Sequence, residues 1–332
     1  MMGTRLLMLL ALAFAGASGA RGNPGHEVTI AELSAQIAQS PGLPELYFQR
    51  AWNYLEIRQV VEARADWNKA LELNPGFLPA SRELARLEAS EGQVDAAMAR
   101  LRKAMATAPP EQAFHRPGCF SVLAELHLSQ GQNAEALVEA KAGLEAAEVL
   151  QLDLVLLRSE AQRRLGLWGT RVDDLRETTA QLRSFVVKTK WFEAMIDAGR
   201  GAEVLPAIEE EIGNSRYQAS WLIRRARIRL RSGDPAGAKS DLQTALAEIE
   251  SRLRPELPDL SLICERGLIR ALLGEKAAAT GDLRLATEKG ADFWMTLPLA
   301  TTLEEPGQSS PLRPKGDEGA APLDAADSSS KP

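Results

Sequence analysis

The chain has 332 residues, a formal net charge of −6 and a sequence pI of about 5.4, and hydrophobic residues make up 45% of it. This apolar content is enough to fold around buried side chains, and the abundance of Ala, Leu, Glu and Arg favours helices throughout. The negative balance gives no support to a nucleic-acid partner, because proteins of that class present excess positive charge to the phosphates.

The first twenty residues have the composition of a secretory signal peptide. Arg5 precedes an apolar run from Leu6 to Ala15, and small residues follow up to Ala20. This order predicts export with cleavage after Ala17 or Ala20, which would place the mature protein in the periplasm or outside the cell. The apolar run is too short to cross a bilayer, so no integral membrane span is expected in the mature chain. The alternative is an uncleaved anchor or a wrongly assigned start.

A spacing of 34 residues runs through the first third of the chain. The prolines that keep this spacing are Pro41, Pro75 and Pro109, and the alanine pairs that keep it are Ala51/Ala85, Ala63/Ala97 and Ala70/Ala104. A period of this length predicts repeated helical hairpins, each packing on its neighbours. Stacked hairpins present a binding surface more often than a catalytic pocket.

The segment before the first complete repeat has the pattern of half a repeat. Thr29-Ile30-Ala31-Glu32 is a capping-box sequence, which predicts a helix that begins there and runs to Pro41. Pro41 continues the proline spacing. Residues 21–43 are therefore interpreted as a linker followed by an N-terminal capping half-repeat.

Numbered from Pro44, the first repeat resembles the tetratricopeptide repeat. That motif has small residues at positions 8, 20 and 27, an aromatic residue at 24 and proline at 32, and the matching residues are Ala51, Ala63, Ala70, Trp67 and Pro75. Small side chains let the helices approach closely, and proline ends the second helix. The resemblance covers residues 44–290 as about seven hairpins. They begin at Pro44, Leu78, Pro117, Leu152, Ser184 or Phe185, Ala219 and Leu260.

The fourth and fifth repeats depart from this motif. Arg171 takes the second small position of the fourth repeat, and Phe192 takes a small position of the fifth. Pro206 is expected to interrupt the second helix of the fifth repeat. Glycine nevertheless stands at the turn between the helices in every repeat after the first, at Gly92, Gly131, Gly166, Gly199, Gly233 and Gly274.

The resemblance implies an all-α fold, an α-solenoid of stacked antiparallel helical hairpins wound as a tetratricopeptide-type superhelix. It also implies a non-catalytic scaffold that holds a protein or peptide mainly in its concave groove. The alternative is a self-associating structural protein. Residues 291–304 are expected to cap the open end of the stack, and residues 305–332, which contain no aromatic residue, are expected to be disordered.

Arginine and aspartate recur sixteen residues apart, at positions 7 and 23 of four repeats. The pairs are Arg50/Asp66, Arg158/Asp174, Arg225/Asp241 and Arg266/Asp282, and the second and third repeats lack them. We interpret each pair as an ion pair between the two helices of one hairpin, since the guanidinium group binds carboxylates in a bidentate manner. The alternative is a row of ligand-binding arginines.

Other arginines fall at positions that line the groove in tetratricopeptide repeats. Arg224, Arg227 and Arg231 share one face of the first helix of the sixth repeat, and Arg82 and Arg86 take groove positions of the second. The resemblance thus suggests a basic groove for an acidic peptide or a carboxylate terminus. The alternative is a solvated face balanced by neighbouring glutamates.

Two aromatic residues take the equivalent groove positions of the first repeat. Phe48 and Trp52 would anchor a peptide if they are exposed, because aromatic residues dominate interface hot spots. Alternatively, they pack on the N-terminal capping helix. The family's clamp for a C-terminal carboxylate has no matching residues here, so a chaperone co-factor role is not carried over.

The sequence offers no basis for catalysis. His26, His115 and His127 share no metal-ligand spacing, and no nucleophile elbow, zinc-protease or phosphate-loop motif occurs. Cys119 and Cys264 fall about four repeats apart, too distant for a disulfide. We therefore expect no enzyme activity, no cofactor and no metal site.

Overall fold

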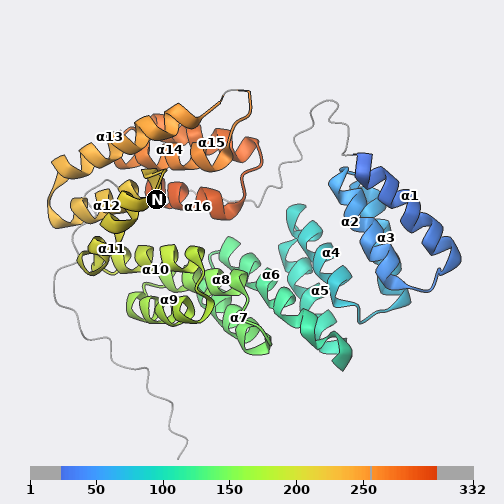
Figure 1. The fold of residues 1–332 in the computed structure, drawn as a ribbon. Helices are drawn as coiled ribbons and strands as arrows, with labels where there is room; N and C mark the ends of the chain where they lie inside the picture. The colour runs from blue at the N-terminus through green and yellow to red at the C-terminus, as the bar shows by residue number, and fades with distance from the viewer. Residues whose placement is uncertain (1–23, 255, 305–332) are drawn as a thin grey trace, which may run out of the picture. The chain divides into compact units, whose positions relative to one another are not determined.

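A computed structural model describes residues 24–254 and 256–304 of the protein (Figure 1). The expected signal peptide and the expected disordered tail lie outside the described residues. The chain divides into two compact units, residues 1–213 and 214–332, which we call the N-terminal part and the C-terminal part and describe separately. The expectation of an all-α fold is confirmed, since the described residues form sixteen α-helices and one short 3-10 helix.

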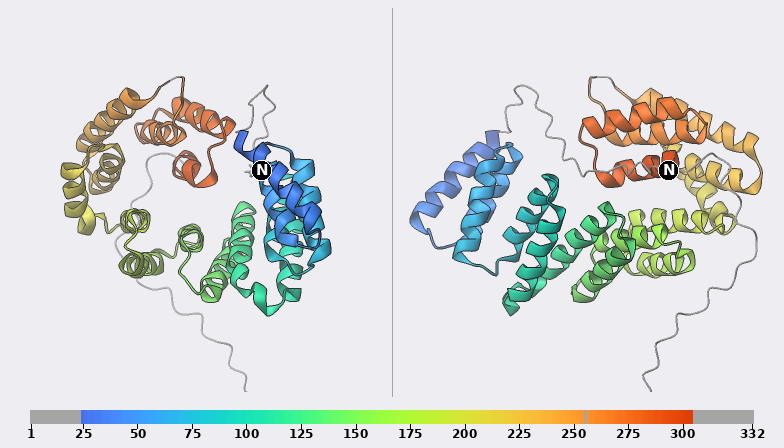
Figure 2. Two further views of the ribbon diagram at one scale, coloured as in Figure 1. Left: turned by 45° about the vertical axis from the view of Figure 1, so that its right-hand side comes forward. Right: turned by 180° about the vertical axis from the view of Figure 1, so that it is seen from behind.

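The N-terminal part holds one leading helix, α1 (Pro24–Gln39), followed by five hairpins (Figure 2). The hairpins are α2 (Pro44–Glu56) with α3 (Val60–Leu73), α4 (Leu78–Ser90) with α5 (Val94–Thr107), α6 (Arg116–Ser129) with α7 (Asn133–Ala146), α8 (Leu152–Arg164) with α9 (Trp168–Leu182), and α10 (Phe185–Asp197) with α11 (Gly201–Asn214). The 3-10 helix η1 (Pro110–His115) precedes α6.

The C-terminal part holds two hairpins and a final helix. The hairpins are α12 (Ala219–Ser232) with α13 (Pro235–Arg252) and α14 (Leu260–Leu272) with α15 (Lys276–Glu288), and α16 (Phe293–Glu304) follows them. In both parts, the first helix of each hairpin begins within one residue of the predicted repeat start.

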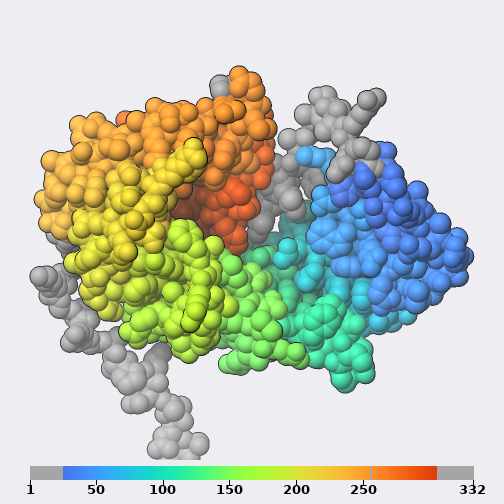
Figure 3. Space-filling model, viewed as in Figure 1, coloured from blue at the N-terminus to red at the C-terminus, as the bar shows by residue number. Residues whose placement is uncertain are grey.

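Small residues at the helix contacts hold each hairpin together. Ala51, Ala63 and Ala70 in the first hairpin are fully buried, and so are Ala85 and Ala97 in the second. Because these residues end at Cβ, the paired helices approach closely, and the larger Trp67 and Leu101 fill the remaining core. Within the N-terminal part, side chains fill the space between successive hairpins on the face that Figure 3 shows.

The turns inside the hairpins have left-handed backbone. The six turn glycines predicted from the sequence all have φ between 71° and 87°, a region that residues with a Cβ atom avoid. The first hairpin has Arg58 at its turn instead, with φ of 62°.

The helix α1 starts earlier than the sequence indicates. It is already helical at Pro24, so Thr29 lies inside the helix, where its hydroxyl donates to the Gly25 carbonyl oxygen (2.8 Å). The capping-box prediction is therefore wrong. The helix packs on α2, where Arg50 Nη1 donates to Ser34 Oγ (2.9 Å).

The predicted interruption of the fifth repeat is also wrong. The helix α11 runs without a break from Gly201 to Asn214, with Pro206 inside it. Pro206 is the sixth residue of this helix, so its missing N–H removes one hydrogen bond of the backbone ladder, and the helix continues on either side of it. Phe192, which the fifth repeat has where the motif expects a small residue, is buried in α10.

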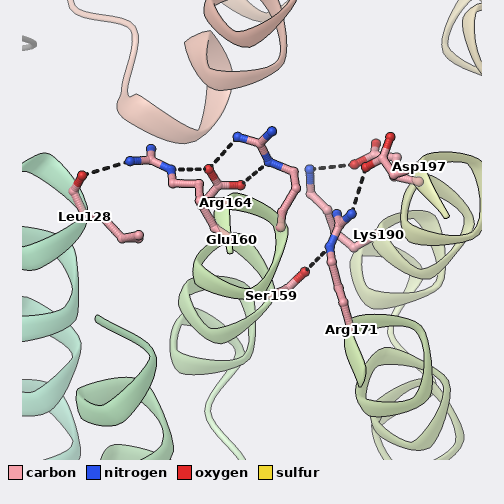
Figure 4. A network of polar contacts seen from close by, with 9 residues as sticks. Leu128, Ser159, Glu160, Arg164, Arg171, Lys190 and Asp197 are labelled. Carbon is pink, nitrogen blue, oxygen red and sulfur yellow. Dashed lines mark hydrogen bonds and ion pairs between the residues drawn. The ribbon is translucent and has the colours of Figure 1, made fainter. Parts of the chain in front are cut away.

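The departure in the fourth repeat is matched by a change in its neighbours (Figure 4). The Arg171 side chain in α9 is 5% exposed, and its Nε donates to Ser159 Oγ (3.0 Å), which stands at the other small position of the same hairpin. Its Nη1 donates to Asp197 Oδ2 (2.7 Å) in α10. A buried arginine with both a hydroxyl and a carboxylate acceptor thus replaces the close alanine contact and links two hairpins.

The ion pairs predicted within the hairpins are confirmed. The pairs Arg50–Asp66 and Arg225–Asp241 are bidentate, with N–O distances of 2.7 to 3.0 Å, and Arg158 lies 3.3 Å from Asp174. Arg266 binds Asp282 in the same way.

The carboxylate at position 23 gains a second basic partner in the C-terminal part. Arg229 lies 2.8 Å from Asp241, and Arg270 lies 2.9 Å from Asp282. In the second hairpin the charges are exchanged, since Arg100 at position 23 binds Glu88 at position 11 (2.9 and 3.0 Å from Nε). The second hairpin thus also has a charged residue at position 23 that pairs with the other helix of the same hairpin.

Two glycines mark close helix contacts. A Cβ atom at Gly143 in α7 would lie 2.7 Å from Leu154 and 2.9 Å from Phe120, and one at Gly267 in α14 would lie 2.5 Å from Leu299 in α16. Leu299 is 1% exposed. The final helix therefore seats a leucine directly against the backbone of α14.

Removing one buried carboxylate tests the ion pairs. We expect Asp241→Ala to lower the free energy of unfolding by about 3 kcal/mol, because it leaves Arg225 and Arg229 without their shared buried acceptor. Urea unfolding followed by circular dichroism measures the change. The matched control is Asp174→Ala, whose side chain is 26% exposed against 4% for Asp241, and it should cost clearly less. Equal stability of Asp241→Ala and the wild type would contradict the structural role.

A methyl group added at a close contact tests the helix packing. Gly143→Ala should destabilise the protein by about 1–3 kcal/mol, since Leu154 and Phe120 must move to admit the new Cβ atom. The control is Gly169→Ala in the first turn of α9, where nothing lies within 4 Å and alanine favours the helix. Thermal unfolding should show a lower Tm for Gly143→Ala alone, and equal Tm values for the two variants would disagree with the contact.

Candidate partner-binding surface

The structure places the two predicted aromatic anchors differently. Trp52 in α2 is 36% exposed. Phe48, one turn earlier, is half-buried, and its ring packs edge-on against that of Phe77 at 5.6 Å between ring centres. Phe48 thus supports the junction of the first two hairpins, whereas Trp52 presents apolar surface to solvent.

Arg82 in α4 has internal neighbours on two sides. Its Nε donates to Glu83 Oε1 (2.8 Å), and its guanidinium lies over Gly118 in α6, where a Cβ atom would come within 2.6 Å of Nη1. The glycine therefore makes room for this arginine. The Glu83 side chain is 6% exposed, so the arginine charge is balanced from inside the protein.

Arg86 is the more accessible arginine of α4. Its side chain is 45% exposed, and its nearest carboxylate contact is long, 3.8 Å from Nη2 to Glu125 Oε2. Burial raises the pKa of Glu125, although the charge of Arg86 opposes the shift. The contact between Arg86 and Glu125 is longer than a hydrogen bond. We call Phe48, Trp52, Arg82 and Arg86 the α2–α4 surface.

The corresponding face of α8 is occupied by its own charges (Figure 4). Glu160 is 5% exposed and accepts hydrogen bonds from Arg163 (2.8 Å) and Arg164 (2.7 Å), and Arg164 also donates to the Leu128 carbonyl oxygen. Burial alone would raise the pKa of Glu160, but these hydrogen bonds outweigh it and lower the pKa. This closed network is structural and offers little to a partner.

The insertion before α6 forms a distinct surface feature. Its 3-10 helix η1 packs against α4 and α6, and Phe114 within it is 67% exposed. The centres of the Phe114 and His115 rings lie 3.8 Å apart. Burial and the nearby Arg82 charge lower the pKa of His115, which favours the neutral ring. The sequence shows the extra residues but not that they carry an exposed aromatic ring.

The three predicted arginines of α12 differ in exposure. Arg224 and Arg227 are half-buried and Arg231 is exposed. The Arg224 guanidinium lies 5.2 Å from the centre of the Trp221 ring, and its Nη1 donates to the Ser220 carbonyl oxygen (2.9 Å). Exposure in this row therefore increases toward the end of α12.

A pocket that the sequence did not indicate lies in the C-terminal part. Its volume is about 180 Å³, and it is lined by Tyr217, Ala219, Ser220, Glu248, Arg252, Ser261, Leu262 and Glu265. Tyr217 precedes α12, and the other residues come from the start of α12, the end of α13 and the start of α14. The register puts Glu265 at the same repeat position as Arg224, which is the only signal that could have drawn attention to it.

Metal ligands and membrane spans are lacking in the part of the chain that the structure describes. Within it, no group of three or more His, Cys, Asp or Glu side chains could hold a metal ion. None of the described helices has both the length and the apolar content that a bilayer crossing requires. Cys119 and Cys264 are both buried free thiols, and burial raises the pKa of each to about 11.

Comparison with known proteins supports the fold. A family model described as the tetratricopeptide repeat matches residues 44–77. A tetratricopeptide repeat and J domain-containing co-chaperone of Fusarium oxysporum is 45% identical over 65 residues, which is 20% of this chain and 12% of that protein. A crystal structure of a tetratricopeptide repeat protein from Parabacteroides merdae has a TM-score of 0.54 at 15% identity, and the match covers 78% of this chain and 98% of that one.

Proposed function

We propose that this chain is a tetratricopeptide repeat protein that holds a protein or peptide partner on the α2–α4 surface. The observation that carries the proposal is the exposed Trp52 on α2, with the exposed Arg86 at the same register position of the next hairpin. Trp and Arg are the residue types most enriched among binding hot spots. The proposed partner segment has an apolar side chain for Trp52 and a carboxylate for Arg86.

The electrostatics of Arg86 support an acidic group in the partner. Its present contact with Glu125 is 3.8 Å long, beyond hydrogen-bond distance. A partner carboxylate that came within hydrogen-bond distance of Arg86 would form a stronger contact than this one. Arg82, by contrast, is balanced by Glu83 and serves mainly to shape the surface.

In the C-terminal part we propose that Arg224, Arg227 and Arg231 form a basic face for an acidic segment. Arg231 is the exposed member and stands in the last turn of α12. Such a contact would weaken as salt is added, because exposed charges are screened beyond about 10 Å at 0.1 M ionic strength.

We also propose that the protein acts after export, in the periplasm or outside the cell. The support is the charge, apolar run and small-residue exit of residues 1–20. N-terminal sequencing of protein from the exported fraction should begin after Ala17 or Ala20. An intact Met1 in that fraction would contradict cleavage.

Substitutions on the α2–α4 surface test the binding proposal. Peptides selected from a random library on the full chain should bind Trp52→Ala at least about 30-fold more weakly, since loss of an aromatic hot spot costs about 2 kcal/mol. Arg86→Glu should reduce the binding of acidic peptides most. Isothermal titration calorimetry measures the affinities.

Two exposed residues elsewhere serve as controls for these variants. Val61→Ala removes a 78% exposed apolar side chain from α3 of the same hairpin, and Arg176→Glu reverses a 64% exposed charge in α9. Both should bind like the wild type. Selected peptides that bind Trp52→Ala and Arg86→Glu with unchanged affinity would refute the α2–α4 surface. A pure protein that is dimeric at micromolar concentration would favour the self-association alternative.

A further inference from the structure

The pocket of the C-terminal part has the size of one side chain. Its volume of about 180 Å³ is below the roughly 300–1,000 Å³ of pockets that hold whole small-molecule ligands. It corresponds to roughly six water molecules in the liquid. The pocket therefore suits a single extended group with one polar end.

Most polar groups that line the pocket already have partners. Glu248 Oε2 accepts from the Gln218 and Ala219 backbone N–H groups (2.7 and 3.1 Å), and its Oε1 accepts from Arg252 Nη1 (3.2 Å). The Arg252 guanidinium lies 3.9 Å from the centre of the Tyr217 ring. Ser261 Oγ donates to Asp259 Oδ1 (2.7 Å), the residue that caps α14.

Among the charged residues that line the pocket, Glu265 differs from Glu248 and Arg252, which bind each other. It is half-buried, and within the described residues its carboxyl group has no hydrogen bond or ion pair. Burial raises its pKa, Arg224 and Arg252 oppose this shift, and Glu248 and Asp259 add to it. These four charged groups come from α12, from α13 and from the turn before α14, and they surround Glu265 without binding it.

The charged groups around the pocket indicate whether its ligand is a cation or an anion. Arg252 is neutralised by Glu248, and Arg224 donates to a carbonyl oxygen and lies against Trp221. An anion would have to displace these contacts and face the Glu265 carboxylate. A cation would instead donate to the Glu265 carboxylate, and the two serine side chains in the lining, Ser220 and Ser261, offer further acceptor oxygens.

We propose that this pocket binds an alkylammonium group, such as the side chain of a lysine in a partner protein, with Glu265 as its counter-ion. An ammonium group has three donors on a narrow apolar stem, which matches one carboxylate and two hydroxyl oxygens in a pocket of this volume. The site is made by other helices than the α2–α4 surface, so the two proposals stand or fall separately.

The pocket and Arg231, the exposed member of the basic face, lie toward opposite ends of α12. Ser220 lines the pocket and Arg231 is eleven residues further on, about 16 Å along a helix. A single extended partner segment with a basic and an acidic residue at that separation would satisfy both ends.

The test uses the full chain and three probes. These are n-butylammonium, a blocked tripeptide with a central lysine, and the same tripeptide with norleucine, which has no charge. Titration at millimolar concentrations is followed through the backbone amide NMR signals of Ser220 and Ser261. The two cationic probes should shift these signals saturably, and the norleucine peptide should not.

A matched pair of variants assigns the contact. Glu265→Gln keeps the shape of the side chain and should weaken binding of the cationic probes about tenfold or more, as loss of a charged hydrogen bond does. Glu288→Gln removes a carboxylate that is 66% exposed in α15 and should bind like the wild type. Binding should also weaken as the pH falls through the raised pKa of Glu265, because protonation removes its charge.

The outcomes separate the source of the ammonium group. Tighter binding of the lysine peptide supports a protein side chain, and tighter binding of butylammonium supports a free amine. Equal signal shifts with the norleucine peptide, or affinities unchanged in Glu265→Gln, would overturn the proposal. Circular dichroism of each variant verifies that the helices remain intact.

Discussion

Close contact between the two helices of each hairpin is the constraint on which the other features depend. Buried alanines at recurring positions bring the backbones together, and the space they leave is filled by one large side chain such as Trp67 or Leu101. Since a hairpin cannot bury its outer face alone, each one relies on its neighbours for the rest of its core. Surface residues are thereby held on rigid helices at a fixed repeat distance.

The same closeness explains the charged groups inside the hairpins. An arginine on the first helix reaches a carboxylate on the second only because the two backbones lie near each other. The pairing survives exchange of the charges in the second hairpin, where Glu88 binds Arg100. It also survives the replacement of an alanine by Arg171, whose bulk and charge are taken up by Ser159 and Asp197. Such compensated changes show how the repeats diverge without loss of the stack.

The sequence predicted what depends on local spacing. The starts of the hairpins, the glycine turns and the sixteen-residue ion pairs all follow from residues at fixed offsets within one repeat. The exchanged Glu88–Arg100 pair escaped prediction because its spacing is twelve residues rather than sixteen. The pocket escaped because its lining comes from three separate segments, whose meeting depends on how α12, α13 and α14 pack. The prediction of a basic groove considered the arginines without the carboxylates beside them. In the structure, Arg82 is paired with Glu83.

The contact between Gly267 and Leu299 has a consequence for how this array could grow in evolution. Repeat proteins lengthen when a hairpin is duplicated inside the array, and the new copy must then meet the terminal helix. The terminal helix α16 packs where position 8 of α14 has no side chain, because that position is Gly267. The same position of α12 is Ala226, whose Cβ atom would occupy the space that Leu299 fills. A copy of the α12–α13 hairpin inserted before α16 would leave Leu299 without its seat. An array that gained a hairpin without a new clash would therefore gain it ahead of the α14–α15 hairpin, with that hairpin and α16 kept together.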